Sequence, residues 1–448
     1  MATSQQFAPA PTTPEGGRYR RHTLQALLCT GAGNAAEWYD WAIYATFASF
    51  MSTQLFRSTD PSSAFLETLA IFAVGFAARP IGGFIFGWVG DRVGRKASMT
   101  ACVAVASLGS LAIGLTPTYE SIGAGASLIL LLARIVQGLG HGGELPSAQA
   151  YLSEMAPASR RGYWSSLIYI SGTAGILFGT LLGAVLSSLL NNSQMAAYGW
   201  RIPFILGAVF GLVTLVMRYR MEESAVFEAK IAKVNGSPRA AAGARDLFAD
   251  LARNWRPALQ IIGITVGFTV CYYVWGVATP AYAIQVLNID ATGALWAGVA
   301  ANLVFLTVLP LWGRLSDRIG RKPVLLVGLL GSAVLFFPAT LFVRDTAWQL
   351  GLAMAVMLVF IGAIAAIAPA VYPELFPTSV RTIGVAVPYA LCVAAFGGTA
   401  AYLQAGFSTW FGDSGSTYFG LYTIILLVVG AATVLGLRET RGADLSAH

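Results

Sequence analysis

Long apolar runs alternate with short polar segments along nearly the whole chain. A helix needs about 20 mostly apolar residues to cross the hydrocarbon core of a bilayer, and each run is close to that length. The pattern predicts twelve membrane-spanning helices, over residues 24–50, 65–89, 97–116, 122–150, 163–189, 200–219, 257–286, 292–313, 323–343, 348–371, 383–410 and 417–437. We therefore expect an all-α membrane protein.

One polar segment is much longer than the others and separates six expected helices from six. The expected organisation is a disordered cytoplasmic tail, an N-terminal six-helix bundle, a cytoplasmic central loop, a C-terminal six-helix bundle and a second cytoplasmic tail. The corresponding residues are 1–22, 23–219, 220–255, 256–438 and 439–448.

A charged loop motif occurs twice, once in each expected bundle. The first copy is Gly87–Lys96 (GWVGDRVGRK) and the second is Gly313–Lys322 (GRLSDRIGRK), about half the chain away. A second pair of loops matches as well, one beginning at Glu154 and the other at Glu374. The repeats indicate two homologous halves that present these loops on the same side of the membrane.

Composition and charge agree with a membrane protein. Hydrophobic residues make up 56% of the chain and charged residues 11%, whereas soluble proteins contain about 25% charged residues. The net charge of +7 belongs to the loops on one side, so nucleic acid is not an expected partner. The positive-inside bias of those loops predicts a plasma (inner) membrane protein with both termini in the cytoplasm. The four cysteines have no metal-binding spacing, and we expect no metal or other cofactor.

The duplicated motif closely resembles the signature of the major facilitator superfamily, in which it joins helices 2 and 3 and, more weakly, helices 8 and 9. Further segments resemble its metabolite:proton symporters, a group that includes permeases for 2-oxoglutarate, citrate and shikimate and the proline/betaine transporter. These segments are Gly33–Asp40, Arg79–Gly83, Arg134–Gly138, Gly142–Glu144 and Gly199–Pro203.

The resemblance implies a monomeric proton symporter that works by alternating access between two six-helix bundles. Helix 5 lacks the Gly-Pro motif of drug antiporters and carries glycines at a close-packing spacing from Gly172 to Gly183, which favours import. Two arginines within the spans favour a small organic anion, such as the dicarboxylate 2-oxoglutarate. Aromatic residues leave proline or betaine open, and shikimate, aromatic acids, citrate and simple facilitated diffusion also remain as alternatives.

Charges inside a bilayer are costly and usually functional. In the first span, Glu37 and Asp40 are three residues apart and share a helical face with Tyr44 one turn further on. We expect these carboxylates to bind the transported proton beside the substrate path. The alternative is a structural salt bridge to Arg79 or Arg134.

A second polar face is expected on the fourth span. It consists of Arg134, Gln137, His141 and Glu144. A guanidinium group can hold a substrate carboxylate, and in the superfamily an arginine in this motif is also linked to proton coupling. The alternative is that Arg134 pairs with one of the nearby carboxylates. Two metal-ligand types, in His141 and Glu144, are too few for a metal site.

Aromatic and gating residues complete the candidates. Tyr273 in the seventh span is a candidate substrate contact through cation–π interaction. The resemblance implies that Asp91 locks the cytoplasmic gate by pairing with an arginine or a helix N-terminus of the other half. The other expected gating residues are Arg79, Arg92, Arg95, Asp317 and Arg318. An enzyme is not expected, because two of the three histidines lie in the tails.

Overall fold

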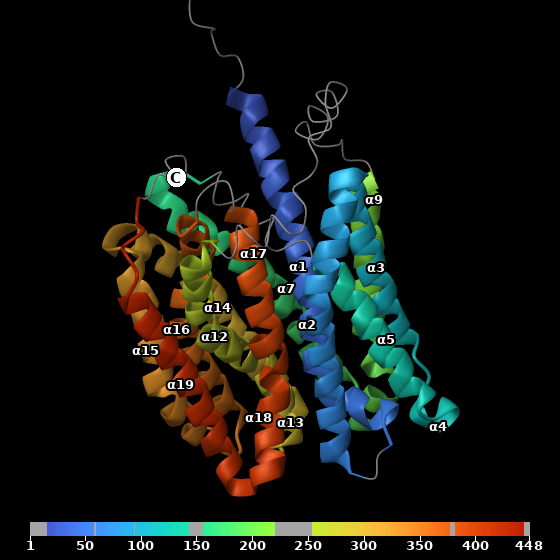
Figure 1. Ribbon diagram of the computed structural model, residues 1–448. Coiled ribbons are helices and arrows are strands. Elements are labelled where there is room, and N and C mark those ends of the chain that lie inside the picture. The colour runs from blue at the N-terminus through green and yellow to red at the C-terminus, as the bar shows by residue number, and fades with distance from the viewer. Residues whose placement is uncertain are drawn as a thin grey trace, which may run out of the picture.

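A computed structural model describes residues 16–57, 60–93, 95–142, 156–219, 253–376 and 381–442, and all regular structure in these segments is helical. Figure 1 shows two groups of long helices side by side. The N-terminal half contains α1 (Gly16–Leu55), α2 (Pro61–Arg92), α3 (Arg95–Leu115), α5 (Gly125–Gly140), α7 (Arg161–Leu189) and α9 (Arg201–Tyr219). Short helices α4 (Tyr119–Ile122) and α8 (Asn192–Gln194) lie in its loops.

The C-terminal half repeats this arrangement with six further crossings. They are α12 (Trp255–Tyr273) continued by α13 (Thr279–Gln285), α14 (Ala291–Ile319), α15 (Arg321–Phe342), α16 (Ala347–Glu374), α17 (Arg381–Cys392) continued by α18 (Gly398–Phe411), and α19 (Gly415–Leu435). Each of the twelve expected spans therefore corresponds to a helix, with ends that shift by up to about ten residues.

Nine apolar stretches of the described residues are long enough to cross a membrane. One of them, Gly384–Leu435, holds two crossings, because it runs through α17, α18 and α19. Helix α5 is a shorter apolar helix, and α1 carries the two buried carboxylates Glu37 and Asp40. The described segments thus have the expected architecture of two six-helix bundles.

Local sequence explains where several helices begin and end. Asp60 accepts hydrogen bonds from the backbone N–H groups of Ser62 and Ser63 and so caps α2. Asp290 caps α14 in the same way through the N–H of Gly293. Helix α14 ends at Ile319 and is followed by Gly320, whose φ of 103° lies in the region that favours glycine. This sharp turn sends the chain into α15 and leaves Asp317 at the end of α14.

The described residues contain three π-helical turns that the hydrophobic pattern does not predict. One, Met195–Gly199, precedes α9, and the other two interrupt long helices of the C-terminal half. Residues Val274–Ala278 join α12 to α13, and Val393–Gly397 join α17 to α18. The hydroxyl of Thr279 donates to the carbonyl of Val274, five residues back, at 2.8 Å. The fourth expected span also differs, because α5 ends at Gly140 and residues 141–142 form a turn.

The two halves meet along α7 and α14, and also where α2 packs against α18 and α1 against α13. We call the side on which α1 begins and α19 ends the terminal face (Figure 1). On this face Ser165 donates to the carbonyl of Ala366 at 2.6 Å. On the opposite face Thr292 donates to the carbonyl of Ser187 at 3.0 Å. The halves are thus in contact at both faces.

Candidate functional site

A buried ion pair lies where the first two helices face the C-terminal half. Glu37 of α1 accepts a hydrogen bond from Arg79 of α2, and the side chain of Glu37 is 1% exposed. The guanidinium of Arg79 also lies over the rings of Trp41 and Phe76, at 5.4 and 5.8 Å from their centroids. This pair is the salt bridge to Arg79 that the sequence left open as the alternative to proton binding, and it joins two residues that were otherwise expected in separate roles.

Aromatic side chains from both halves surround this pair, and we call them the interface aromatic cluster. Its members are Trp38, Phe76, Tyr169, Phe268, Tyr272, Tyr273 and Tyr389. Trp38 stacks on Tyr273 with centroids 5.8 Å apart and meets Tyr272 edge-on at 5.3 Å. Phe76 packs against Tyr273 at 5.0 Å.

The same cluster brings hydroxyl groups toward the ion pair. The hydroxyls of Tyr169 and Tyr389 lie 3.5 Å apart across the boundary between the halves. Tyr273 and Tyr389 are close enough to Arg79 to interact with it electrostatically. A largely buried guanidinium and several buried phenol hydroxyls form a set of donors suited to an anionic ligand.

Arg134 occupies a different environment, inside the N-terminal half. It is 0% exposed, and its guanidinium lies between the rings of Trp41 and Tyr44, at 4.4 and 4.2 Å from their centroids. Arg134 donates to Gln137, while its Nε and Nη2 have no hydrogen-bond partner among the described residues. It does not form an ion pair with Glu37 or Asp40 in this conformation, and aromatic rings separate it from the interface.

Asp40 points to other partners than Glu37 does, although the two are one turn apart. Its Oδ1 accepts a hydrogen bond from Ser110 of α3 at 2.9 Å, and its Oδ2 lies 3.3 Å from Nε2 of His141. Tyr44, the third residue expected on this face, donates to the carbonyl of Thr68 at 2.9 Å. The shared face predicted for these residues thus divides into two polar groups.

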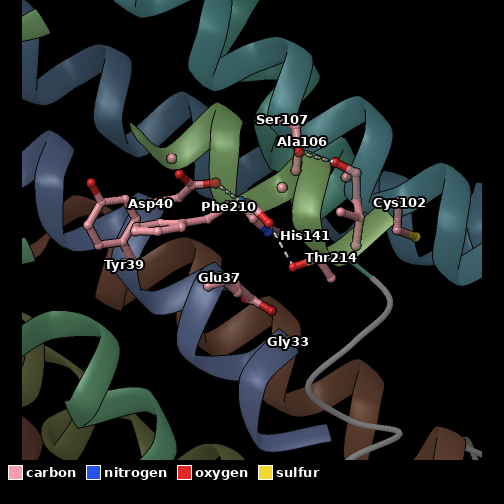
Figure 2. A pocket seen from close by; sticks show the side chains of 15 residues that line it. Gly33, Glu37, Tyr39, Asp40, Cys102, Ala106, Ser107, His141, Phe210 and Thr214 are labelled. Carbon is pink, nitrogen blue, oxygen red and sulfur yellow. Dashed lines mark hydrogen bonds and ion pairs between the residues drawn. The ribbon is translucent and has the colours of Figure 1, made fainter. Parts of the chain in front are cut away.

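A small cavity borders both carboxylates of α1. Its lining includes Glu37 and Asp40 from α1, Cys102 and Ser107 from α3, His141 after α5, and Thr214 from α9. Its open volume is about 30 Å³, enough for roughly one water molecule. Figure 2 shows Asp40 and His141 facing each other, with Glu37 one turn along the same helix.

A separate ionic network joins the two halves at the terminal face. The carboxylate of Asp317 accepts hydrogen bonds from the backbone N–H groups of Gly162 and Tyr163, both at 2.9 Å. It therefore binds the N-terminus of α7 in the other half. Arg321 binds Asp317 at 2.8 Å, and Arg161 binds Glu374 at 3.0 Å.

The end of the chain is tied to this network as well. Glu439 accepts from the backbone N–H groups of Arg321 and Lys322, at 2.8 and 3.1 Å, and Thr440 donates to Glu374 at 2.6 Å. Partial burial raises the pKa of the Glu439 carboxyl, but its bonds to the N–H groups of Arg321, Arg441 and Lys322 outweigh this and hold the pKa below its usual value.

Some expected site residues lie outside what the structure describes. Glu144 is not among the described residues, and neither is most of the expected central loop. The backbones of Asp91, Arg92 and Arg95 lie at the end of α2 and the start of α3, but their side chains are not described. The carbonyl of Arg318 accepts from Arg441 at 2.6 Å.

Several residues of the interface aromatic cluster and of the ionic network at the terminal face were not singled out from the sequence. Tyr169 and Tyr389 in the cluster gave no signal, because aromatic residues are common throughout membrane helices. Arg321 and Glu374 belong to the repeated loop motifs. Because the repeats place matching loops on the same side of the two halves, their position in a repeat was a signal that they contact another loop. Arg161 follows the first copy of the Glu154 loop and had the same signal.

The comparisons with known proteins agree with the fold and narrow the class. A model of the sugar (and other) transporter family matches residues 26–447. The alpha-ketoglutarate permease of Escherichia coli (strain K12) is 32% identical over 452 residues, covering 99% of this chain and 100% of that protein. The proline/betaine transporter of the same strain is 29% identical over 440 residues, 97% of this chain and 86% of that protein.

The solved structures support the same architecture. The crystal structure of a D-xylose-proton symporter matches with a TM-score of 0.72 and 20% identity, over 94% of this chain and 100% of that one. At this identity the match concerns the fold alone. Taken with the family model and the curated relatives, it leads to one conclusion: the chain is a multi-pass membrane transporter and belongs to the sugar (and other) transporter family of the major facilitator superfamily.

Proposed function

We propose that this protein is a proton-coupled importer of a small organic anion, such as the dicarboxylate 2-oxoglutarate, and that it works by alternating access. One observation carries the proposal, namely the buried ion pair of Glu37 and Arg79 at the boundary between the two halves. The pair lies against the interface aromatic cluster, which separates when one half rocks against the other.

The chemistry of the pair links proton binding to anion binding. When Glu37 takes up a proton it no longer neutralises Arg79, and a buried charge without a partner costs about 3–5 kcal/mol. A substrate carboxylate can then replace Glu37, because guanidinium binds any carboxylate in the same forked geometry. The proton and the anion thus bind together, which is the requirement for symport.

The hydroxyls beside Arg79 favour a ligand with a second acceptor group. Tyr273 and Tyr389 lie near the guanidinium, and Tyr169 lies within 3.5 Å of Tyr389. A dicarboxylate could place one carboxylate on Arg79 and the other on these phenols. The similarity to the alpha-ketoglutarate permease supports this choice.

A zwitterion such as proline or betaine is the second candidate. The rings of Trp38, Tyr272 and Tyr273 pack against one another with centroids 5.3–5.8 Å apart. Aromatic faces that become accessible when such rings move apart bind ammonium groups. The similarity to the proline/betaine transporter favours it. Shikimate, aromatic acids and citrate are further carboxylates that the same arginine would accept.

We also propose the orientation and surroundings of the chain. Most lysines and arginines of the chain fall in segments that the sequence assigns to the side of the terminal face, and the positive-inside rule places that side in the cytoplasm. The bundles then comprise residues 23–219 and 256–438 within a plasma membrane bilayer, and the protein acts as a monomer with its substrate and a proton as ligands.

Uptake into proteoliposomes tests the proposal. We expect labelled 2-oxoglutarate to accumulate when the pH outside is lower than inside, and to equilibrate without accumulation when the gradient is collapsed. Accumulation of proline alone would replace the anion by a zwitterion. Uptake of 2-oxoglutarate that ignores the gradient would show a facilitator and contradict proton coupling.

The variant Glu37→Gln separates the carboxylate from the rest of the site. We expect it to reduce gradient-driven accumulation about 100-fold, because an amide does not carry the proton. The matched control is Glu67→Gln, which removes an exposed carboxylate on α2 and should leave accumulation at the wild-type level. Full accumulation by Glu37→Gln would show that Glu37 is not the proton carrier.

A further inference from the structure

The N-terminal half contains a second chain of buried polar side chains, which the ion pair of Glu37 and Arg79 does not use. Arg134 donates to Gln137, Gln137 donates to Ser110 at 2.7 Å, and Ser110 donates to Asp40 at 2.9 Å. His141 lies at the end of this chain, with Nε2 at 3.3 Å from Asp40 Oδ2. All of these groups are buried.

The cavity between α1, α3, α5 and α9 connects this chain to Glu37. Both Glu37 and Asp40 border it, and His141 forms part of its wall. The lining from α3 and α9 includes Cys102, Ser107 and Thr214. Cys102 precedes the midpoint of α3, Ser107 lies just past it, and Thr214 lies near the end of α9. His141 follows the last residue of α5 at the terminal face, so the cavity extends from the middle of the bundle toward that face.

Glycines keep this region narrow. A Cβ added at Gly140 would come within 2.7 Å of the backbone N of Ala106, and one added at Gly207 would come within 3.0 Å of Asp40 Oδ1. The helices around the cavity therefore approach one another closely, and the open space left beside the two carboxylates has room for about one water. A water there needs two to four polar neighbours, and the two carboxylates and the imidazole supply them.

We infer that Asp40 and His141 form a proton relay that receives the transported proton from Glu37 through this cavity and releases it at the terminal face. The inference rests on the proposed function, in which Glu37 carries the proton. After the substrate leaves, Arg79 and Glu37 form their ion pair again. The carboxyl group of Glu37 then gives its proton to a water in the cavity, and that water passes a proton to the imidazole of His141. The resulting imidazolium lies beside the carboxylate of Asp40 and then loses the proton to the aqueous side.

The groups that face His141 suit this task. From α1 it faces Asp40, with Glu37 across the cavity, and the ring of Trp41 lies 5.9 Å away. Gln137 and Arg134 of α5 are connected to His141 by the hydrogen bonds that run through Ser110 and Asp40. From α3 and α9 it faces Cys102, Ser107 and Thr214. The relay ends with release of the proton to water, so its rate depends on the proton concentration on the releasing side.

The experiment compares two transport modes of the full-length protein in proteoliposomes at internal pH values from about 5.5 to 8. Net uptake of labelled 2-oxoglutarate requires proton release inside, whereas exchange of internal for external 2-oxoglutarate does not. For the wild type we expect net uptake to fall about tenfold as internal pH decreases across this interval, with a smaller change in exchange. For His141→Gln we expect net uptake to be slow at every internal pH, with less than about a twofold pH dependence.

Two further variants keep the test decisive. Asp40→Asn removes the other member of the pair and should flatten the profile in the same way. Thr180→Val is the control, because Thr180 is buried in α7 and donates to Ile176 of its own helix at 2.9 Å; it should keep the wild-type profile. The relay is refuted if His141→Gln retains the wild-type internal-pH profile. If His141→Gln does not fold, the same result with Asp40→Asn refutes it.

This failure differs from a failure of the proposed function. Wild-type protein that exchanges 2-oxoglutarate but shows no gradient-driven uptake and no proton entry, followed with an internal pH-sensitive dye, refutes proton coupling and the relay together. Wild-type protein that couples to protons, with a His141→Gln profile like its own, refutes the relay alone.

Discussion

At the residue scale, Arg134 illustrates how a membrane protein stabilises a charge without a direct carboxylate. Two aromatic rings sandwich its guanidinium at 4.2 and 4.4 Å, and Gln137 accepts from it. The negative charge of Asp40 is two neutral groups away, through Ser110 and Gln137. The planar guanidinium suits this environment, because it stacks on both rings while donating in its own plane.

We therefore expect Arg134→Lys to be destabilising although it preserves charge. A compact ammonium cannot stack on two rings, and the loss of desolvated cation–π contact is about 2 kcal/mol. Thermal unfolding in detergent should show a lower Tm. The control is Arg256→Lys, because Arg256 lies over Trp255 at 5.5 Å on an exposed surface and should change little. An equal Tm for wild type and Arg134→Lys would show that the stacking contributes nothing.

The sequence indicated which charges are buried and left their pairing open, with Arg79 and Arg134 both named as partners for the carboxylates of α1. Glu37, Asp40, Arg79 and Arg134 stand out in apolar runs, and hydropathy alone finds them. Their partners depend on the rotation and tilt of neighbouring helices, which one sequence does not specify. Thus Glu37 and Asp40, on one predicted face, contact Arg79 of α2 and Ser110 of α3 respectively.

At the element scale, the glycines of α7 let it pack closely against α1. A Cβ added at Gly175 would lie 2.0 Å from the carbonyl oxygen of Ala35, and one at Gly172 would lie 2.8 Å from the ring of Trp38. The spacing of these glycines predicts a close-packing face, and the structure places α1 on it. The same packing positions Glu37 and Trp38 toward the C-terminal half.

Gly175→Ala should therefore destabilise the N-terminal half and weaken transport. The added methyl group meets backbone, which cannot move aside, and overpacking of this kind costs about 1–3 kcal/mol. The control is Gly87→Ala in α2, where a Cβ would meet nothing within 4 Å; it should keep or slightly raise the Tm. A Gly175→Ala protein as stable as wild type would mean that α1 and α7 can separate without cost.

The π-helical turns were not predictable in the same way. A π turn adds one residue to a helical turn. In a run that is apolar on nearly all faces the sequence has no periodicity that would reveal the extra residue. In α12 the hydroxyl of Thr279 supports the turn. In α17 the turn ends at Gly397, where a Cβ would lie 2.7 Å from the ring of Tyr273. Both turns thus lie beside the interface aromatic cluster.

At the scale of the whole molecule, the twelve helices, their order and the two homologous halves followed from hydropathy and repeats. The bilayer makes this part predictable, because each crossing must satisfy its own backbone hydrogen bonds. How the halves touch was less accessible, because contacts such as Trp296 of α14 with Ser188 of α7, at 3.2 Å, leave no pattern in the sequence.

Alternating access requires that contacts at one face break while those at the other persist, and Asp317 is the best point at which to bias that choice. Its carboxylate binds the N-terminus of α7 through two N–H groups at 2.9 Å, where a negative charge contributes about 1 kcal/mol. Asp317→Asn should therefore favour separation at the terminal face about fivefold. Spin labels at the exposed residues Ser159 and Ile319 report that face, and labels at Leu189 and Trp348 report the opposite one.

We expect pulsed electron paramagnetic resonance to show longer Ser159–Ile319 distances in Asp317→Asn and no lengthening between Leu189 and Trp348. Asp345→Asn, which removes an exposed charge near the opposite face, should leave both distributions unchanged. The contrast matters because the two halves touch at both faces, so a contact that merely stabilises each bundle would shift neither distance. Unchanged Ser159–Ile319 distances would show that Asp317 only stabilises its own bundle and does not hold the terminal face closed.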